Sequence, residues 1–329
     1  MAILVTGGTG YLGKRVVKRL VEEGEEVVLL VRRSSNLTHL PSDIRRIYGD
    51  ITDYHSVREA MRGCDRVLHM AALVKMWVRP RSLYELVNVA GFKNLIRAAK
   101  EEGISKFIYT SSFIALGPSD GKVLDEKSVI ERDRFYTDYE RTKYFAHKVA
   151  KEAAEEGFPI VILYPGVIYG PGELTEGNLV AGIIRDFINR KLPGKLGKGD
   201  KKWCYAFIDD VVSGHISALK KGKPGEGYIL GGENRSANEF FALLSELTGI
   251  EPPKRSIPYF LASMMGYFEE MLALLFGRYP NLTHGVVKTY MHDWAYSSKK
   301  AISELSYSIT PLREGLSRTI TWLREEGYV

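Results

Sequence analysis

The chain has 329 residues, a length that suits one large α/β domain together with a smaller one. Its formal net charge is +6, but basic residues alternate with acidic ones, so no long basic tract points to nucleic acid. Its only cysteines, Cys64 and Cys204, do not suggest a disulfide framework. An apolar segment starts at once, without the pattern of a signal peptide, so we expect a protein of the reducing cytoplasm.

Short apolar runs alternate with amphipathic stretches along the first half of the chain, which is the pattern of parallel βαβ units. The runs are residues 2–6, 27–31, 45–48, 66–70, 107–110 and 160–163. The clearest helical stretches between them are residues 83–102 and 139–156. An α/β fold with a doubly wound parallel sheet is therefore predicted over residues 1–170.

The pattern of predicted elements changes after Pro165-Gly166, where loops rich in Gly, Pro and Lys separate shorter helices. We expect residues 171–329 to form mainly a smaller, substrate-binding lobe. A segment around residues 203–220 is expected to return to the first domain.

A glycine-rich turn joins the first apolar run to the first helix. Gly7, Gly10 and Gly13 have the spacing G-x-x-G-x-x-G, a variant of the dinucleotide fingerprint. Gly7 would allow a tight turn, Gly10 the approach of a pyrophosphate, and Gly13 close packing of the helix against the sheet. The helix N-terminus would offer free N–H groups to a phosphate. A Rossmann-type cofactor site is predicted here, with the residues Gly7, Thr9, Gly10, Tyr11, Leu12 and Gly13.

Tyr139 and Lys143 are four residues apart on a predicted helix, so their side chains share one face. A free tyrosine has a pKa near ~10, which is too high for a base at neutral pH. Lys143 and a positive nicotinamide ring would have to lower it by ~3 units, or ~4 kcal/mol. Ser112, at the end of another apolar run, would hydrogen-bond the substrate oxygen. Tyr139, Lys143 and Ser112 are the predicted catalytic residues of a nicotinamide-dependent oxidoreductase.

Several motifs together give the chain, over essentially its whole length, a resemblance to the extended short-chain dehydrogenase/reductase family. They are T-G-G-T-G-Y-L-G, Y-G-D-I-T-D, H-M-A-A, N-V-A-G-F-K-N-L, Y-T-S-S, Y-E-R-T-K and Y-P-G-V-I-Y-G-P-G. Residues 75–77, 113–117 and 294–301 are most similar to the dihydroflavonol-reductase-like branch. Within it the plant farnesol dehydrogenases are most similar, and the hopanoid-associated sugar epimerase-like proteins are similar too.

The resemblance implies roles for single residues. Tyr139 and Lys143 match the catalytic pair, and Ser112 matches the catalytic serine ahead of the alternatives Ser111 and Thr110. The remaining cofactor positions that it implies are Asp50 and Ile51 beside the adenine, Ala71 and Ala72 along the cofactor, and Pro165, Gly166 and Ile168 against the nicotinamide.

Two further polar residues, Asn88 and His69, lie in motifs of the resemblance without a clear catalytic role. No metal site is expected. Asn88 matches a position behind the cofactor, where a structural role is equally compatible. His69 is expected to be a packed core residue rather than a catalyst.

Arg32 bears on the form of the cofactor. An NAD-selective site usually has Asp or Glu about 20 residues after the glycines, whereas this chain has Arg32-Arg33-Ser34 at the end of its second apolar run. A guanidinium suits a 2′-phosphate, so NADP(H) is favoured. In the alternative, Arg32 stacks on the adenine and NAD(H) is used, as in the farnesol dehydrogenases.

The substrate pocket is predicted by analogy alone. Its candidate residues are Lys75, Met76, Trp77, Phe113, Tyr169, Trp203 and Tyr205. This largely apolar and aromatic set suits a prenyl alcohol, a flavonoid or a steroid-like carbonyl better than a sugar nucleotide.

A strongly apolar segment, residues 257–276, admits three interpretations. Glu269 and Glu270 interrupt it, so it falls short of the ~20 apolar residues of a membrane span. A buried helix is the favoured interpretation. A hydrophobic lid over an apolar substrate and a peripheral membrane contact are the alternatives.

The leading functional hypothesis is an alcohol dehydrogenase or carbonyl reductase for a bulky, mostly apolar small molecule. A nucleotide-sugar epimerase or dehydratase with retained NAD is the alternative enzyme. A non-catalytic dinucleotide-sensing module is disfavoured by the Tyr139/Lys143 pair. The oligomeric state is left open, although relatives commonly form homodimers.

Overall fold

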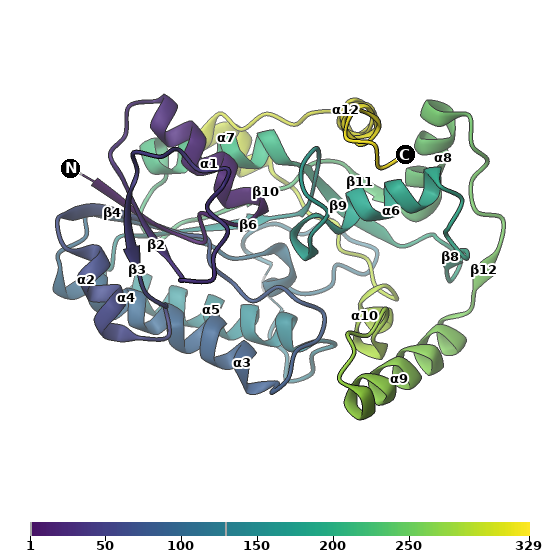
Figure 1. Ribbon diagram of the computed structural model, residues 1–329, viewed down its shortest axis with the longest axis horizontal. Coiled ribbons are helices and arrows are strands. Elements are labelled where there is room, and N and C mark those ends of the chain that lie inside the picture. The colour runs from purple at the N-terminus through teal and green to yellow at the C-terminus, as the bar shows by residue number, and fades with distance from the viewer. Residues whose placement is uncertain (1, 129) are drawn as a thin grey trace.

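The computed structural model describes residues 2–128 and 130–329. Its centre is a parallel sheet of seven strands in the order β10-β6-β5-β4-β1-β2-β3 (Figure 1). The strands are β1 (Ala2–Thr6), β2 (Val27–Val31), β3 (Arg45–Tyr48), β4 (Cys64–His69), β5 (Lys106–Thr110), β6 (Ile160–Pro165) and β10 (Gly227–Leu230). The predicted doubly wound sheet is thereby confirmed.

Apolar side chains are buried on both faces of this sheet. Every residue of β1, β2 and β6 is buried, as expected for parallel strands that helices cover on both sides. On one face lie α1 (Tyr11–Glu22) and α7 (Ile208–Lys221), and on the other α2 (Tyr54–Met61), α4 (Gly91–Glu101) and α5 (Asp138–Glu155) (Figure 1). Two hydrophobic cores result, one on each side of the sheet.

The strand order reverses between β1 and β4. β1 pairs with β2 on one side and with β4 on the other, in both cases in parallel. A ligand site in such a sheet lies outside the carboxyl ends of the strands at this reversal. The chain places the glycine turn there, directly after β1.

Smaller elements form the rest of the molecule. A three-stranded sheet contains β7 (Val167–Tyr169), β9 (Lys202–Phe207) and β11 (Asn234–Ser236), and a two-stranded one contains β8 (Lys195–Leu196) and β12 (Ser256–Ile257). The further helices are α3 (Ser82–Glu85), η1 (Leu86–Ala90), η2 (Phe113–Ala115), η3 (Glu176–Asn178), α6 (Leu179–Ile188), α8 (Ala237–Thr248), α9 (Tyr259–Phe276), α10 (His284–Thr289), α11 (Lys299–Leu305) and α12 (Leu312–Glu325).

The return of the chain to the main sheet is more extensive than the sequence indicated. The segment around residues 203–220 comprises β9, which belongs to the three-stranded sheet, and most of α7, which packs against α1. β10, which we did not predict, then pairs with β6 at the edge of the main sheet. The main sheet therefore includes residues up to Leu230.

Helix α9 is not buried, and the favoured interpretation of residues 257–276 was wrong. Phe260, Leu275 and Phe276 are exposed to 69%, 68% and 73%. Figure 1 shows α9 at the lower right, away from the main sheet and beside α10. Few elements pack against α9, so most of its apolar side chains stay exposed. Its apolar composition alone therefore did not indicate whether the helix is buried.

Candidate active site

The glycine turn has the backbone geometry that its sequence requires. Gly7 has a positive φ of 75°, and a Cβ there would lie 2.5 Å from the backbone nitrogen of Ala71. A Cβ on Gly13 would collide with the carbonyl oxygen of Gly7, so this glycine lets α1 approach the turn itself rather than the sheet. A Cβ on Gly10 would meet only the Gly7 oxygen, at 3.4 Å. The space outside Gly10 is therefore open to a ligand.

The N-terminus of α1 has the features of an anion site. Its N-cap residue is Gly10, which gives no side-chain hydrogen bond, and its first turn contains no acidic residue. In contrast, Asp53 and Thr137 cap α2 and α5 with their side chains. Free N–H groups and the helix dipole favour a phosphate at such an end. This cradle fits the pyrophosphate of a dinucleotide.

Lys143 is anchored to the end of β5. It is only 3% exposed, and its Nζ donates a 3.0 Å hydrogen bond to the carbonyl oxygen of Thr110. The same nitrogen lies 5.4 Å from the centre of the Tyr109 ring. Burial lowers the pKa of Lys143 to about 7, because the charged ammonium loses its hydration.

Tyr139 lies one helical turn before Lys143, on α5. Burial raises the pKa of its phenol to about 12, and a hydrogen bond with the Ser112 hydroxyl opposes this shift. A base at neutral pH would need a lowered pKa, whereas the protein's own groups raise the pKa of this phenol. Tyr139 is therefore a neutral acid at pH 7, next to Ser112.

Local capping fixes the start of α5. The Thr137 side chain accepts a hydrogen bond from the backbone nitrogen of Glu140 at 3.1 Å. The Glu140 carboxylate is fully buried, accepts a 2.7 Å hydrogen bond from the backbone nitrogen of Tyr136 and lies 3.5 Å from Arg132. These bonds and the ion pair fix the helix end that carries Tyr139, while Oε1 of Glu140 and Nη1 of Arg132 make no hydrogen bond within the described residues.

Asn88 ties α5 to the loop after β4. Its side chain accepts from the Leu73 nitrogen at 2.7 Å and donates to the Leu73 oxygen at 3.1 Å and to Thr142 at 3.0 Å. Asn88 lies in η1, a single π-helical stretch of a kind that is often found at functional sites. Since these bonds engage both amide ends, Asn88 positions the neighbouring elements.

Two polar contacts at the site have no signal in the sequence. The Thr110 hydroxyl lies 3.0 Å from Nε2 of the buried His215, whose Nδ1 lies 2.7 Å from the Val211 oxygen. On the other side, Nδ1 of His69 lies 2.7 Å from the Thr6 hydroxyl. Burial lowers the pKa of His69 to about 3, so it is a neutral residue of the core, stacked on Phe92.

The predicted cofactor residues lie along the carboxyl edge of the main sheet. Asp50 accepts hydrogen bonds from the nitrogen and hydroxyl of Thr52 at 2.9 and 2.8 Å, and Ile51 is buried against Gly91. Arg32 directly follows β2 and is exposed. No side-chain partner of Arg32 occurs among residues 2–128 and 130–329, so its guanidinium is available to a ligand.

Ala71 and Ala72 lie in the loop after β4, one intervening residue beyond its end, and are partly exposed. Pro165 ends β6, and Ile168 lies in β7. A Cβ on Gly166 would approach the carbonyl oxygen of Cys204 to 2.5 Å, so this loop packs closely against β9.

Part of the predicted substrate set forms an aromatic wall. Phe113 follows Ser112 directly, and its ring lies 6.3 Å from that of Trp203. The Trp203 ring in turn lies 4.7 Å from that of Tyr290 and 6.0 Å from that of Trp294. This wall, which we define as Phe113, Trp203, Tyr290 and Trp294, starts beside the predicted catalytic serine. Phe113 and Trp294 are buried in the core, so its partly exposed rings are those of Trp203 and Tyr290.

The other predicted substrate residues lie in two different places. Tyr169 is 1% exposed in the core, against Phe207 and Gly315, while Tyr205 is partly exposed and stacks on Phe240. In contrast, Lys75, Met76 and Trp77 lie in the loop after β4, where the Met76 nitrogen donates to the hydroxyl of Tyr279 at 3.1 Å. The structure thus groups Phe113 with Trp203 but places Tyr169 apart from them.

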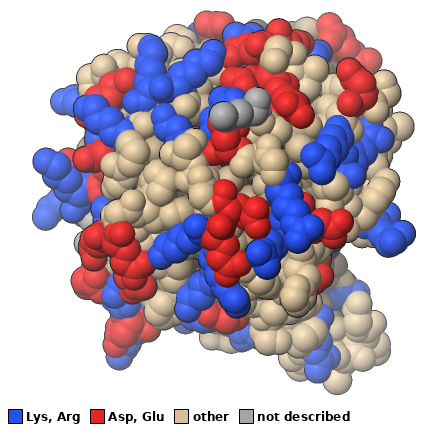
Figure 2. Space-filling view, turned by 90° about the vertical axis from the view of Figure 1, so that its left-hand side faces the viewer, with Lys and Arg blue, Asp and Glu red and all other residues tan. Residues whose placement is uncertain are grey.

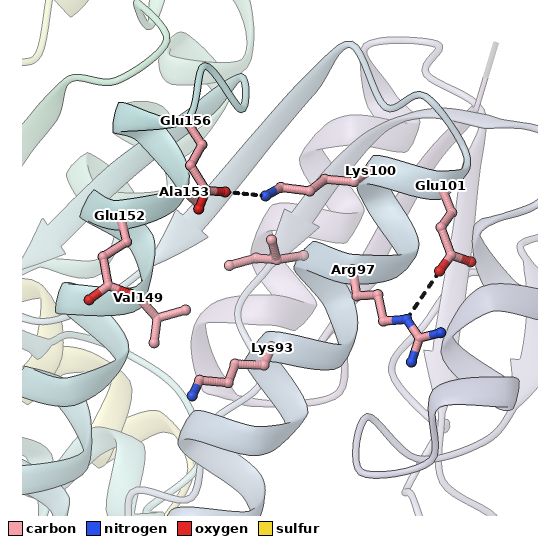
Figure 3. Close-up of a pocket in the computed structure, with 9 residues that line it drawn as sticks. Lys93, Arg97, Lys100, Glu101, Val149, Glu152, Ala153 and Glu156 are labelled. Carbon is pink, nitrogen blue, oxygen red and sulfur yellow. Dashed lines mark hydrogen bonds and ion pairs between the residues drawn. The ribbon is translucent and has the colours of Figure 1, made fainter.

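A groove of about 380 Å³ lies elsewhere, between α4 and α5 (Figure 3). Its lining is largely charged, and Lys100 and Glu156 form an ion pair across it. None of the predicted catalytic or cofactor residues lines this groove. It is therefore not the candidate active site.

Two other kinds of site find no support in the described residues. In the part of the chain that the structure describes, no three His, Cys, Asp or Glu side chains gather as metal ligands. Figure 2 shows Lys and Arg interspersed with Asp and Glu on the face that it presents. No basic stripe for nucleic acid is visible on that face.

The fold and this edge define a dinucleotide-binding α/β protein. Residues 3–231 match the model of the NAD dependent epimerase/dehydratase family, and the chain belongs to this family. Its cofactor is accordingly a nicotinamide dinucleotide. The resemblance to extended short-chain dehydrogenases/reductases is confirmed, while the narrower one to farnesol dehydrogenases stays a prediction.

Full-length relatives include two bacterial proteins. A Synechocystis protein with the provisional name dihydroflavonol 4-reductase is 34% identical over 99% of this chain and 95% of its own length. Sterol demethylase protein B of Methylococcus capsulatus is 31% identical over the whole of both chains.

Solved structures have the same fold. The crystal structure of gox2253 is similar with a TM-score of 0.85 and 31% identity, covering 100% of this chain and 99% of that one. The UDP-glucose 4-epimerase of Thermotoga maritima is similar with a TM-score of 0.80 and 24% identity, over 99% of each chain. At that identity the likeness to the epimerase shows the fold alone.

Proposed function

We propose that the protein is an NADP(H)-dependent oxidoreductase that interconverts an alcohol and a carbonyl on a bulky, mostly apolar substrate. The observation that carries this proposal is the aromatic wall, which begins at Phe113 directly beside Ser112. A sugar nucleotide would need polar partners where the partly exposed rings of Trp203 and Tyr290 lie, whereas a prenyl, flavonoid or sterol group would bury apolar surface against them. Two relatives have the names dihydroflavonol 4-reductase, given provisionally, and sterol demethylase protein B, which supports the same substrate class.

In the proposed reaction, a bound nicotinamide supplies or accepts the hydride. Ser112 donates a hydrogen bond to the substrate oxygen, and Tyr139 transfers a proton to that oxygen in the reducing direction. The raised pKa of Tyr139 suits an acid that stays protonated until the oxygen becomes negative. Lys143, fixed by the Thr110 carbonyl, contributes positive charge when protonated and would bind the nicotinamide ribose.

Arg32 supports NADP(H) over NAD(H). Its side chain is exposed directly after β2, where the ribose 2′ position of a dinucleotide would lie. A charge-assisted bond to a 2′-phosphate would use this guanidinium, and no carboxylate of β2 or of residues 32–34 is present to bind a 2′-hydroxyl. Asp50 and Ile51 would then flank the adenine.

The location and oligomeric state stay proposals. Cys64 and Cys204 are both free and buried, which supports a reducing, cytoplasmic location. A homodimer remains a prediction for the assembly.

The test is titration with NADPH and NADH of protein first checked for nucleotide retained from expression. We expect the apo protein to bind NADPH at least about tenfold more tightly, since a charged hydrogen bond contributes about 1.5–3 kcal/mol. Preference for NADH would contradict the role of Arg32. Protein that carries tightly bound NAD would favour a nucleotide-sugar epimerase, which consumes no added nicotinamide.

A further inference from the structure

Helix α9 has its apolar side chains outside and its charged side chains inside, the reverse of an ordinary surface helix. Phe260, Met264, Phe268, Met271, Leu275 and Phe276 are all exposed, to between 46% and 73%. By length and composition, α9 is also the one helix among the described residues that could cross a membrane. A water-facing surface of this kind marks an interaction site.

The inner side of α9 is fixed against α10. A Cβ on Gly266 would lie 2.5 Å from the backbone nitrogen of His284, so only a glycine allows this close approach. Glu269 binds Arg278 at 2.8 Å, and Glu270 accepts a hydrogen bond from the His284 nitrogen at 2.9 Å. Since both carboxylates are engaged by the protein, α9 has one fixed orientation with its apolar side outward.

Both ends of α9 return to the same folded lobe. β12 ends just before it and pairs with β8, and residues 277–283 lead directly to α10, which packs on α9. A spanning helix would have its ends on opposite sides of a bilayer. The connections of α9 therefore fit a helix that lies flat in a membrane surface, over about 27 Å at 1.5 Å per residue.

Basic residues surround the exposed face. Residues 73–81 include Lys75, Arg79 and Arg81 but no acidic residue, and Lys254 and Arg255 precede α9. Arg81 pairs with Asp138 and Lys254 pairs with Glu251, so within the described residues the basic charge without a carboxylate partner comes from Lys75, Arg79 and Arg255. Arg79 donates to the Leu274 carbonyl at 3.2 Å, and the Lys75 ammonium lies 5.9 Å from the centre of the Tyr279 ring. The loop of residues 73–81 thus adds positive charge beside the C-terminal half of α9.

We propose that α9 and the loop of residues 73–81 form a docking surface for anionic lipid. Aromatic and aliphatic side chains would enter the boundary between headgroups and acyl chains, while the basic rim would bind the headgroups. A second copy of the chain fits less well, because a symmetric contact would bring two positive rims together.

The docking surface adjoins the candidate active site. The loop of residues 73–81 follows Ala71 and Ala72, and the ring of Tyr290, directly after α10, lies 4.7 Å from that of Trp203 in the aromatic wall. An apolar substrate dissolved in the bilayer would thus reach the site at the membrane surface. This last step rests on the proposed function, whereas the docking itself does not.

The test is flotation of the full-length protein with vesicles of phosphatidylcholine alone or mixed with phosphatidylglycerol, in the absence of substrate. We expect binding to the anionic vesicles. The variant Phe268→Ser/Leu275→Ser/Phe276→Ser should reduce the partition coefficient at least about tenfold, since each side chain loses apolar burial. Arg79→Gln and Arg255→Gln should each reduce binding to anionic vesicles about fivefold.

The matched control is Val123→Ser/Ile302→Ser, which removes apolar side chains that are 61% and 45% exposed elsewhere. This control should float like the wild type, and light scattering should give all variants the same mass. Absence of wild-type binding, or equal flotation of the triple variant, would overturn the proposal. A triple variant that turns a dimer into a monomer would overturn it too and assign α9 to a second copy. Because no turnover is measured, failure of the proposed reaction would not affect this result.

Discussion

The carboxyl edge of the main sheet and helix α9 both place groups in an environment opposite to their usual one. At the sheet edge, the ammonium of Lys143 is 3% exposed, although lysine is rarely buried. On α9, the side chain of Phe276 is 73% exposed, although phenylalanine is commonly buried. Each arrangement costs stability in the free protein, and our proposals give each a ligand that offsets the cost: a dinucleotide at the edge and a lipid surface at α9.

Replacement of Tyr139 by Phe should have the largest effect at the sheet edge. The variant lacks the proton that we assign to the substrate oxygen, so kcat should fall at least about 100-fold. Binding of NADPH, measured by fluorescence titration, should change little. Tyr136→Phe, which alters a partly exposed ring stacked on His292, is the control and should keep its activity. An unchanged kcat in Tyr139→Phe would contradict the assignment.

Replacement of Arg32 by Ala tests the cofactor end of the same edge. Loss of a charged hydrogen bond to the 2′-phosphate should weaken NADPH binding about tenfold to 100-fold and leave NADH binding unchanged. Arg33→Ala is the neighbouring control, since the Arg33 guanidinium lies over the Tyr48 ring. Equal loss of affinity for both nucleotides would indicate stacking on the adenine instead.

The buried ammonium of Lys143 should make stability depend on pH. Burial lowers its pKa from 10.5 to about 7, so between these values the unfolded chain binds the extra proton. The free energy of unfolding should therefore rise with pH, by about 2 kcal/mol between pH 7 and 9. This stabilising contribution is fully present above the pKa of Lys143 in the unfolded chain, 10.5, and it is lost as the pH falls toward 7.

Denaturant unfolding at pH 7, 8 and 9 measures this slope. The variant Lys143→Met should lack the rise, because it has no proton to bind. The raised pKa of Tyr139, about 12, acts only above pH 10 and does not interfere. If the free energy of unfolding changes equally with pH in the wild type and in Lys143→Met, Lys143 is hydrated rather than buried.

Replacement of Asn88 by Leu should have a smaller effect that still reaches the chemistry. The loss of its bonds to Leu73 and Thr142 should lower the free energy of unfolding by about 1–2 kcal/mol. Because Asn88 positions α5, kcat should fall more than KM rises. Asn189→Leu, which removes a bond to the Tyr328 carbonyl at the surface, is the control. A drop in stability with kcat unchanged would limit Asn88 to a structural role.

The sequence predicted the main sheet well where apolar runs were continuous. Strands β1, β2, β5 and β6 are found where apolar runs placed them and β4 begins two residues earlier, since parallel strands covered on both faces give such runs. β3 was also predicted, although it is a partly exposed edge strand with two arginines. β10 was not predicted, because its four residues, Gly227 to Leu230, form a short run that follows a loop rich in Gly and Lys. Pairing with β6 rather than local pattern fixes this strand.

The candidate site was predicted in part. The glycine turn and the Tyr139/Lys143 pair depend on local spacing, which a sequence displays. The bonds of Thr110 to Lys143 and His215 join residues far apart in the chain, so spacing gave no sign of them. The orientation of α9 was hidden for a similar reason, because an apolar composition does not tell which face neighbours cover.

The most direct test of the account is deuterium transfer from NADPH labelled at the reactive C4 position to farnesal or a steroid ketone. We predict one deuterium at the carbinol carbon for each NADP⁺ formed, and at least about 100-fold slower formation of both products with Tyr139→Phe. Activity on nucleotide sugars without net consumption of NADPH, and without deuterium in any alcohol, would contradict the proposed oxidoreductase.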